Sequence, residues 1–211
     1  MRVLVACEES QRITIAMRAL GHEAYSCDLE PCTGGHPEWH RQEDVLGGIL
    51  QEPWDLVIAH PPCTYLTCTG NRWFDVERYG EKAIERAKLR EEAVDFFLEF
   101  TKLDHVPRVA IENPVGVMST RYRKPDQKVH PWMFGDPIQK GTCWWLKGLP
   151  LLEPTNIVDP ANDVYVYANG KKDSKWHMET MKLPAKERAR VRSMTFPGMA
   201  EAIAAQWGGE A

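Results

Sequence analysis

Two short polar segments contain the side chains best suited to covalent chemistry. Cys63 follows His60–Pro62, and Glu112 precedes Asn113 and Pro114, each directly after an apolar run typical of a buried strand. A thiolate is a soft nucleophile that can attack an electron-poor ring carbon, and a carboxyl group can activate such a ring by hydrogen bonding. If the two strands are neighbours, about 4.8 Å separates their ends. A thiol and a carboxyl group at that spacing can hold a planar heterocycle between them.

The elements that must position these side chains follow the pattern of an α/β sheet. In the first half of the chain, short apolar runs alternate with stretches of helical spacing, which predicts mostly parallel strands. We expect strands at Val3–Cys7, Glu23–Cys27, Asp55–Ala59 and Arg108–Ile111, with weaker signals at Thr142–Leu146 and Val164–Ala168. We expect helices at Ile13–Leu20, Glu77–Leu103, Ala185–Arg192 and Gly198–Trp207, with Ala83, Ile84, Val94 and Phe97 on the buried face of the longest. Ligands bind at the carboxyl ends of strands in such sheets, which makes Cys63 and Glu112 site candidates.

Composition and charge narrow the function classes. The chain has 211 residues, 26 Lys and Arg against 30 Asp and Glu, and a formal net charge of −4. This balance excludes a uniformly basic nucleic-acid coat but leaves room for a local basic groove. Membrane spans need about 20 consecutive apolar residues, and no run approaches that length. The six cysteines are scattered along a chain long enough to form its own core, so we expect no disulfide framework.

The two polar segments also carry a family resemblance. The segment Asp55–Cys63 looks like the Pro-Cys nucleophile motif of the C5-cytosine methyltransferases. The segment Val109–Pro114 resembles the Glu-Asn motif of the same family, where a valine more often follows the asparagine. Both motifs follow buried strands in the family's order, after a strand and helix resembling a nucleotide-binding unit. The chain is therefore similar to the C5-cytosine-specific DNA methyltransferases, in particular to compact phage-type members.

This resemblance implies a role for each catalytic residue. Cys63 would attack C6 of cytosine, and Glu112 would hydrogen-bond N3 and the exocyclic amine. C5 would then take a methyl group from S-adenosylmethionine. Pro62 would fix the nucleophile turn, and Asn113 belongs to the same motif as Glu112. A duplex target would require base flipping, because attack on C5 and C6 is blocked within the stack.

The resemblance also implies a site for S-adenosylmethionine. Asp28 matches the acidic residue that binds the cofactor ribose, and Asp44 resembles the residue that reaches the adenine amine. The full set of expected cofactor-binding residues is Ala6, Cys7, Glu8, Ser10, Asp28, Asp44, His60 and Pro61. The family's first motif is rich in glycine, whereas this loop is not, which leaves less room for close backbone approach to a ligand. The sulfonium of the cofactor is positive, so acidic residues in this loop are chemically tolerable.

The expected nucleic-acid contacts are basic residues around the proposed site. We expect them at Arg72, Arg121, Arg123, Lys124 and Lys140, with a second basic run from Lys171 to Arg192. The family's Gln-x-Arg-x-Arg motif is not recovered, since Gly141 and Cys143 stand where its arginines would be. Lys140 can substitute for them as a charge, but not as a bidentate donor.

Length distinguishes this chain from the usual members of the family. We expect one domain over residues 1–211, with a catalytic core of about 1–147 and a short extension, 148–211, in place of a target-recognition domain. Sequence readout would then be short, absent, or supplied by a homodimer or another partner. The resemblance implies a Rossmann-like methyltransferase fold with helices on both faces of the sheet. It also implies a protein of the cytoplasm, in a bacterial or phage-infected host cell.

Several alternatives stay open at this point. The acceptor could be RNA or a free cytosine nucleotide, the donor could be a modified S-adenosylmethionine, or the fold could bind nucleic acid without catalysis. Cys27, Cys32, His36 and His40 have spacings compatible with zinc, but we favour a core cysteine followed by a polar loop and predict no metal. A dinucleotide oxidoreductase is disfavoured because no Gly-x-Gly-x-x-Gly follows the first strand.

Overall fold

The computed structural model describes residues 1–209 and contains a seven-stranded sheet in the order β3-β2-β1-β4-β5-β7-β6. The strands are β1 (Arg2–Ala6), β2 (Glu23–Asp28), β3 (His40–Gln42), β4 (Leu56–Ala59), β5 (Arg108–Pro114), β6 (Gln127–Val129) and β7 (Thr142–Lys147). The first five run parallel, and β7 is antiparallel to both β5 and β6. The predicted Rossmann-like α/β class with a mostly parallel sheet is therefore confirmed.

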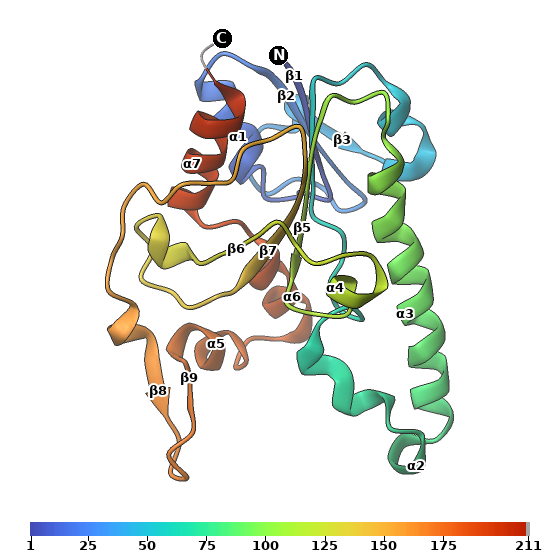
Figure 1. Cartoon of the computed structure of the whole chain (residues 1–211), viewed down its shortest axis with the longest axis vertical. Coiled ribbons are helices and arrows are strands. Elements are labelled where there is room, and N and C mark those ends of the chain that lie inside the picture. Colours follow the sequence, from blue (N-terminus) through green and yellow to red (C-terminus); the bar gives the residue numbers. More distant parts are fainter. Residues whose placement is uncertain (210–211) are drawn as a thin grey trace.

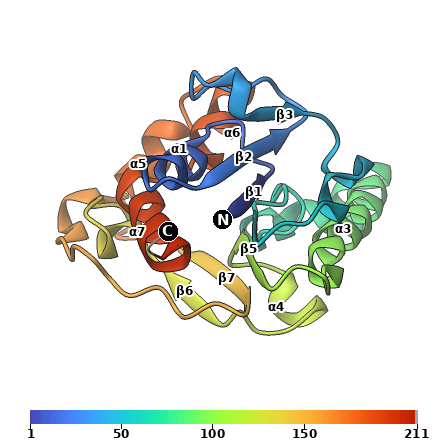
Figure 2. The same ribbon diagram turned by 90° about the horizontal axis from the view of Figure 1, so that it is seen from above.

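Helices cover both faces of this sheet (Figure 2). One face carries α1 (Arg12–Ala19) and α7 (Pro197–Gly208), and the other carries α3 (Glu81–Glu99). The shorter helices are α2 (Val76–Tyr79), α4 (Met118–Arg121), α5 (Lys175–Thr180) and α6 (Ala185–Ser193). A separate hairpin of β8 (Val164–Val166) and β9 (Lys172–Ser174) projects at the lower left of Figure 1.

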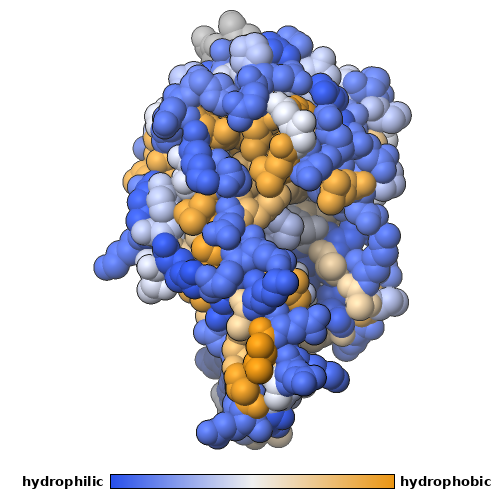
Figure 3. Space-filling model, turned by 90° about the vertical axis from the view of Figure 1, so that its right-hand side faces the viewer, coloured by the Kyte–Doolittle hydropathy of each residue, from blue (hydrophilic) through white to orange (hydrophobic). Residues whose placement is uncertain are grey.

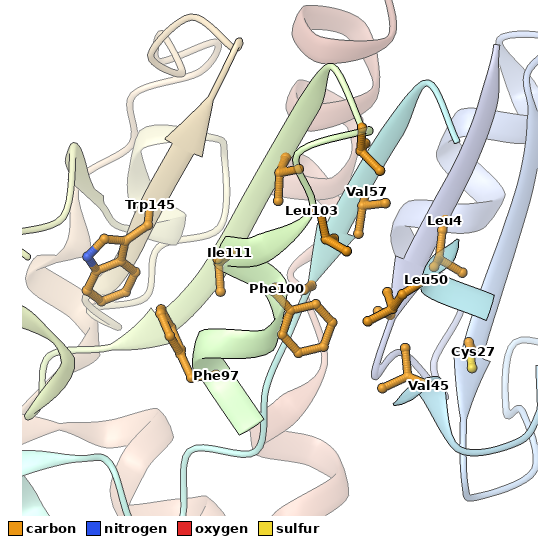
Figure 4. Close-up of a cluster of buried hydrophobic side chains, with 14 of the residues drawn as sticks. Leu4, Cys27, Val45, Leu50, Val57, Phe97, Phe100, Leu103, Ile111 and Trp145 are labelled. Carbon is orange, nitrogen blue, oxygen red and sulfur yellow. The ribbon is translucent and has the colours of Figure 1, made fainter. Parts of the chain in front are cut away.

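Two apolar clusters form the core, one on each face of the sheet. Successive strand residues point to opposite faces, so Leu4 enters the cluster under α3 while Val3 and Val5 enter the cluster under α1 and α7. Figure 4 shows the α3 side, where Phe97 and Phe100 pack among the strand side chains. Because both faces of the central strands are buried, side chains on both sides of each strand are apolar, and the strands appear in the sequence as continuous apolar runs.

The long helix differs from its prediction in two respects. Gly80, with φ +56°, separates α2 from α3, so the expected continuous helix is broken. Ala83 is buried as expected, whereas Ile84 is 59% exposed. The lower part of α3 extends beyond the sheet (Figure 1), so the sheet buries few of its side chains there. The face of the molecule on this side is mostly hydrophilic (Figure 3).

The strand that carries Glu112 is longer than predicted. We expected it to stop at Ile111, but β5 continues through Glu112 and Asn113 to Pro114 because antiparallel β7 pairs with it over that length. Glu112 therefore lies on a paired strand rather than in a loop. The short elements β3, β6, β9, α4 and α5 have no counterpart among the predictions, since segments this short have little periodicity.

Within residues 1–209, no helix combines the length and the apolar character that crossing a membrane requires.

Candidate active site

The two motif segments meet at the carboxyl ends of neighbouring strands. β4 and β5 pair in parallel with Ala59 opposite Ile111, so the next residues, His60 and Glu112, stand side by side. His60 Nδ1 lies 3.4 Å from Glu112 Oε2. On the other side of Glu112, β7 places Trp144 opposite it. The adjacency of strands on which the sequence argument depended is therefore present.

Hydrogen bonds anchor the turn that carries Cys63. The buried side chain of Asn113 donates from Nδ2 to the carbonyl of Pro61 at 2.8 Å, which ties the turn to β5. The carbonyl of Cys63 accepts from the amides of Leu66 at 3.0 Å and Thr67 at 3.1 Å. The position of Cys63 is thus set by β5 as well as by its own strand.

Opposing charges act on the Cys63 thiol. Surrounding protein atoms raise its pKa through desolvation, and the Glu112 carboxylate raises it further. Lys140 and Arg192 act in the opposite direction, because a nearby cation favours the thiolate. The thiol, the carboxylate and the two cations therefore lie within electrostatic reach of one another, although Cys63 itself is exposed.

Lys140 is held in place by the carboxyl-terminal part of the chain. Its Nζ donates to the carbonyl of Arg192 at 2.8 Å and lies 5.8 Å from the ring centre of Trp176 and 5.7 Å from that of Phe196. Desolvation lowers the Lys140 pKa, while Glu112 and Cys63 oppose that shift. The lysine is therefore one of two basic residues, with Arg192, that act on the thiol.

A cavity of about 10 Å³ lies beside Glu112. Its lining includes His60, Glu112, Lys140, Trp144 and Phe196. That volume holds about one water molecule, which is much smaller than a nucleobase. Residues 193–196 line the same cavity.

The expected cofactor residues Cys7, Asp28 and Asp44 gather at the ends of the first two strands. Burial raises the pKa of the Cys7 thiol, and the carboxylates of Asp28 and Asp44 raise it further, so both acids lie close to Cys7. One oxygen of Asp28 accepts from the Glu30 amide at 2.9 Å, and one of Asp44 accepts from the Leu46 amide at 3.0 Å. Within residues 1–209, no side-chain hydrogen bond involves the second oxygen of either carboxylate. These oxygens are acceptors that suit ribose hydroxyls or an amine, so the two acids fit S-adenosylmethionine.

Glu8 lies differently from Asp28 and Asp44. Its buried carboxylate accepts from the amides of Ile13 at 2.7 Å and Thr14 at 3.3 Å, and from the Thr14 hydroxyl at 2.8 Å. Both oxygens of Glu8 therefore cap α1, whose own N-cap residue, Gln11, contributes no side-chain cap. Ala6 and Ser10 are also buried, and the Ala6 carbonyl accepts from the His60 amide at 2.9 Å. The cofactor roles of these loop residues remain predictions.

Among the expected nucleic-acid contacts, Lys140 is the residue that the fold brings to Cys63 and Glu112. Arg121 forms an ion pair with Glu91, and Arg123 forms a bidentate pair with Asp126 at 2.8 and 2.7 Å. Arg72 stacks over the ring of Trp73 at 4.7 Å, and Lys124 is exposed. The contacts of these residues with nucleic acid remain predictions.

Three of the four residues with zinc-like spacing contact other groups. Cys27 is buried with its thiol 3.5 Å from the Glu43 carbonyl, and His40 Nδ1 lies 2.8 Å from the Ser26 hydroxyl. His36 stacks on the Trp39 ring, with ring centres 3.8 Å apart. Over residues 1–209, no three His, Cys, Asp or Glu side chains gather in a metal-binding arrangement.

Sequence reasoning missed the aromatic wall of the site. Trp176 and Phe196 pack with ring centres 5.5 Å apart behind Lys140, and both come from the carboxyl-terminal region. The backbone here is held by Asp163, whose carboxylate accepts from the amides of Gln139 at 3.0 Å and Trp176 at 2.9 Å. No local pattern marks these residues, because their role depends on contacts between distant segments.

Comparisons with known proteins give similarity in structure only. No protein family matches the chain in sequence, and no curated protein matches it. One similar solved structure is a proposed DNA modification methyltransferase encoded within a prophage of E. coli, with a TM-score of 0.46, 16% identity, and coverage of 75% of this chain and 52% of the other. Another is the Dnmt2 methyltransferase of S. pombe, with a TM-score of 0.45, 12% identity, and coverage of 72% and 51%. The aligned part of this chain thus spans about half the length of either structure.

Proposed function

We propose that this protein transfers a methyl group from S-adenosylmethionine to C5 of cytosine in DNA. The observation that carries the proposal is the meeting of Cys63 and Glu112 at the ends of neighbouring strands, with Lys140 beside them. A thiol, a carboxyl group and a cation in one place suit nucleophilic addition to an electron-poor ring. The resemblance of the two motifs to those of C5-cytosine methyltransferases supports cytosine as that ring.

The chain's own residues account for activation of the base. The Cys63 thiolate forms a bond to C6, and the electron pair of the C5–C6 double bond moves into the ring. Glu112 holds N3 and the exocyclic amine, which stabilises the electron-rich ring. Asn113 keeps the nucleophile turn against β5 through its bond to Pro61. Lys140 favours the thiolate form of Cys63.

S-adenosylmethionine, held by Asp28 and Asp44, would supply the methyl group as an electrophile. Once C5 has gained the methyl group, with the sulfonium leaving as a neutral thioether, the C5 proton would pass to water. The electron pair left behind re-forms the C5–C6 double bond and expels the Cys63 thiolate, which frees the enzyme. His60 Nδ1 lies 3.4 Å from Glu112 Oε2, and this contact orients the carboxyl group that holds the base.

The test is nucleoside mass spectrometry of host DNA after expression of the protein. We expect cytosine heavier by one methyl group, and no modified cytosine with Cys63→Ala at equal expression and equal melting temperature. Methylcytosine that persists in Cys63→Ala would refute the covalent mechanism. If the DNA is unmodified and RNA or a cytosine nucleotide is methylated instead, DNA is not the acceptor and that other substrate takes its place in the proposal.

A further inference from the structure

Lys140 and Arg192 act on the Cys63 thiol, and Arg188 lies near Arg192. Arg188 and Arg192 lie one turn apart on α6, and Lys140 comes from the segment before β7. Lys140 and Arg192 share one aromatic surface, since the ammonium and the guanidinium each lie 5.8 Å from the ring centre of Trp176. The backbone carbonyl of Arg192 accepts from Lys140 Nζ at 2.8 Å, which joins α6 to the site.

Within residues 1–209, these cations form no ion pair with a carboxylate. None of the ion pairs there includes Lys140, Arg188 or Arg192. Arg188 donates to the carbonyls of Met181 and Leu183, both at 3.3 Å, and Arg192 contacts the sulfur of Met181 at 3.7 Å. Arg121 and Arg123, by contrast, are each paired with an acid elsewhere on the surface.

Glu112 and Asp173, the acids that act on Lys140 and Arg192, also contact other groups. Asp173 lies 3.0 Å from His177 Nδ1 and accepts from the Tyr167 hydroxyl at 3.2 Å, while Glu112 contacts His60. Burial and the neighbouring Arg188 both lower the Arg192 pKa. Like charges held together away from water are unfavourable unless an anion joins them, so the arrangement is suited to an anionic ligand.

We propose that Arg192 and Arg188, together with Lys140, bind the backbone phosphate beside the target cytosine. The proposal rests on the proposed function for the nature of the substrate. A planar guanidinium matches two phosphate oxygens, and a lysine adds a point charge. A phosphate held here would place its nucleotide next to Cys63, so the substrate would carry a phosphate, as a nucleic-acid strand does and a bare nucleoside does not.

The surrounding surface favours the same ligand. Residues 171–192 contain eight Lys and Arg against three Asp and Glu, although the whole chain has a net charge of −4. α5 and the β8–β9 hairpin lie at the lower left of Figure 1, toward the end of the molecule opposite the amino terminus, and α5 packs against α6 as well as against the hairpin. β1 starts at that terminus and leads toward this end, where the carboxyl ends of the parallel strands carry the site. A strand steered to this basic region would thus arrive at the nucleophile.

The test is binding of a fluorescein-labelled, cytosine-containing single-stranded DNA, measured by anisotropy without cofactor between about 50 and 200 mM NaCl. Each lost phosphate contact flattens the slope of log K against log salt by about 0.7 for a single strand. We expect the slope to flatten by that amount for Arg192→Gln and by about twice that amount for the double variant Arg188→Gln/Arg192→Gln. Arg192→Lys should bind with an affinity between those of the wild type and Arg192→Gln. The matched control is Arg190→Gln, which removes an exposed arginine from the same helix.

The outcomes separate this inference from the proposed function. A wild-type slope in Arg192→Gln, or an equal loss in Arg190→Gln, would overturn the phosphate site even if the wild type methylates cytosine. Because binding is measured without cofactor, an absence of methylcytosine would refute the proposed function and leave the binding result intact. Thermal melting of each variant shows that a loss of binding is not a loss of fold.

Discussion

At the residue scale, the reactivity of Cys63 depends on a balance of neighbouring charges. Desolvation and Glu112 raise its pKa, and Lys140 and Arg192 lower it. The thiolate is the reactive form, so its fraction at a given pH decides the rate of attack. The sequence placed Cys63 and Glu112 together, but the cations around them come from segments whose position it did not specify.

We predict that Lys140→Met shifts alkylation of Cys63 by iodoacetamide to higher pH. Lys140 normally lowers the pKa of the Cys63 thiol, so its removal lets desolvation and Glu112 raise that pKa further. The fraction of thiolate at pH 8 therefore falls. The rate at Cys63 is followed by peptide mass spectrometry, because Cys68 is also exposed. Lys124→Met, which removes an exposed lysine, is the control. Equal profiles for Lys140→Met and the wild type would show that the lysine does not act on the thiol.

At the element scale, the turn after β4 is held against the end of β5 by close backbone packing. A Cβ at Gly116 would lie 2.0 Å from the Leu66 carbonyl oxygen and 2.8 Å from its carbon, and Gly116 also forms a bridge with Thr67. These contacts follow Cys63 directly along the chain. The turn therefore depends on a glycine in a different segment as much as on its own prolines.

We predict that Gly116→Ala lowers both stability and turnover. The added methyl group must push the Leu66–Thr67 backbone away, and overpacking of this kind costs about 1–3 kcal/mol. Gly47→Ala is the matched control, because its Cβ would meet only Asp44 at 3.9 Å. Urea unfolding gives the stability, and methyl incorporation into DNA gives the turnover. A variant with the stability and turnover of the wild type would contradict the close packing.

At the scale of the whole molecule, the carboxyl-terminal helix completes the core that begins at the amino terminus. α7 packs on α1 and buries Met199, Ile203 and Trp207 in the same cluster as Val3 and Val5. Between these helices, His22 is 2% exposed, and within residues 1–209 neither of its ring nitrogens has a hydrogen-bond partner. Burial lowers the His22 pKa, with the amino terminus and Arg108 adding to the effect.

We predict that this histidine makes the fold sensitive to acid. Its pKa is lower in the folded than in the unfolded chain, so the unfolded chain binds more protons once the pH falls below about 6.5. Stability is therefore retained above that pH and lost below it, by at most about 1.4 kcal/mol per pH unit for one proton. Urea unfolding from pH 7.5 to 5.5 should show a smaller decline for His22→Leu than for the wild type. The same decline in both would assign the acid sensitivity to other groups.

Local patterns were sufficient for much of the fold. The apolar runs predicted β1, β2, β4 and β7, because strands buried on both faces need continuous apolar residues. The end of α2 at Gly80 and the exposure of Ile84 were not predicted, since helical periodicity does not report where a helix leaves the sheet. The extension of β5 through Glu112 escaped prediction because it depends on pairing with β7.

The sequence by itself determined the chemistry that the candidate site offers: a thiol after two prolines, a carboxyl group before an asparagine, and acids after the first strands. Residue type and local spacing are enough for that conclusion. Only the tertiary structure decided which charges surround the thiol, since Lys140 and Arg192 reach it from distant segments. It also assigned Glu8 to the cap of α1 rather than to an open loop. Contacts between distant segments arise from packing of the whole chain, and no short stretch of sequence encodes them.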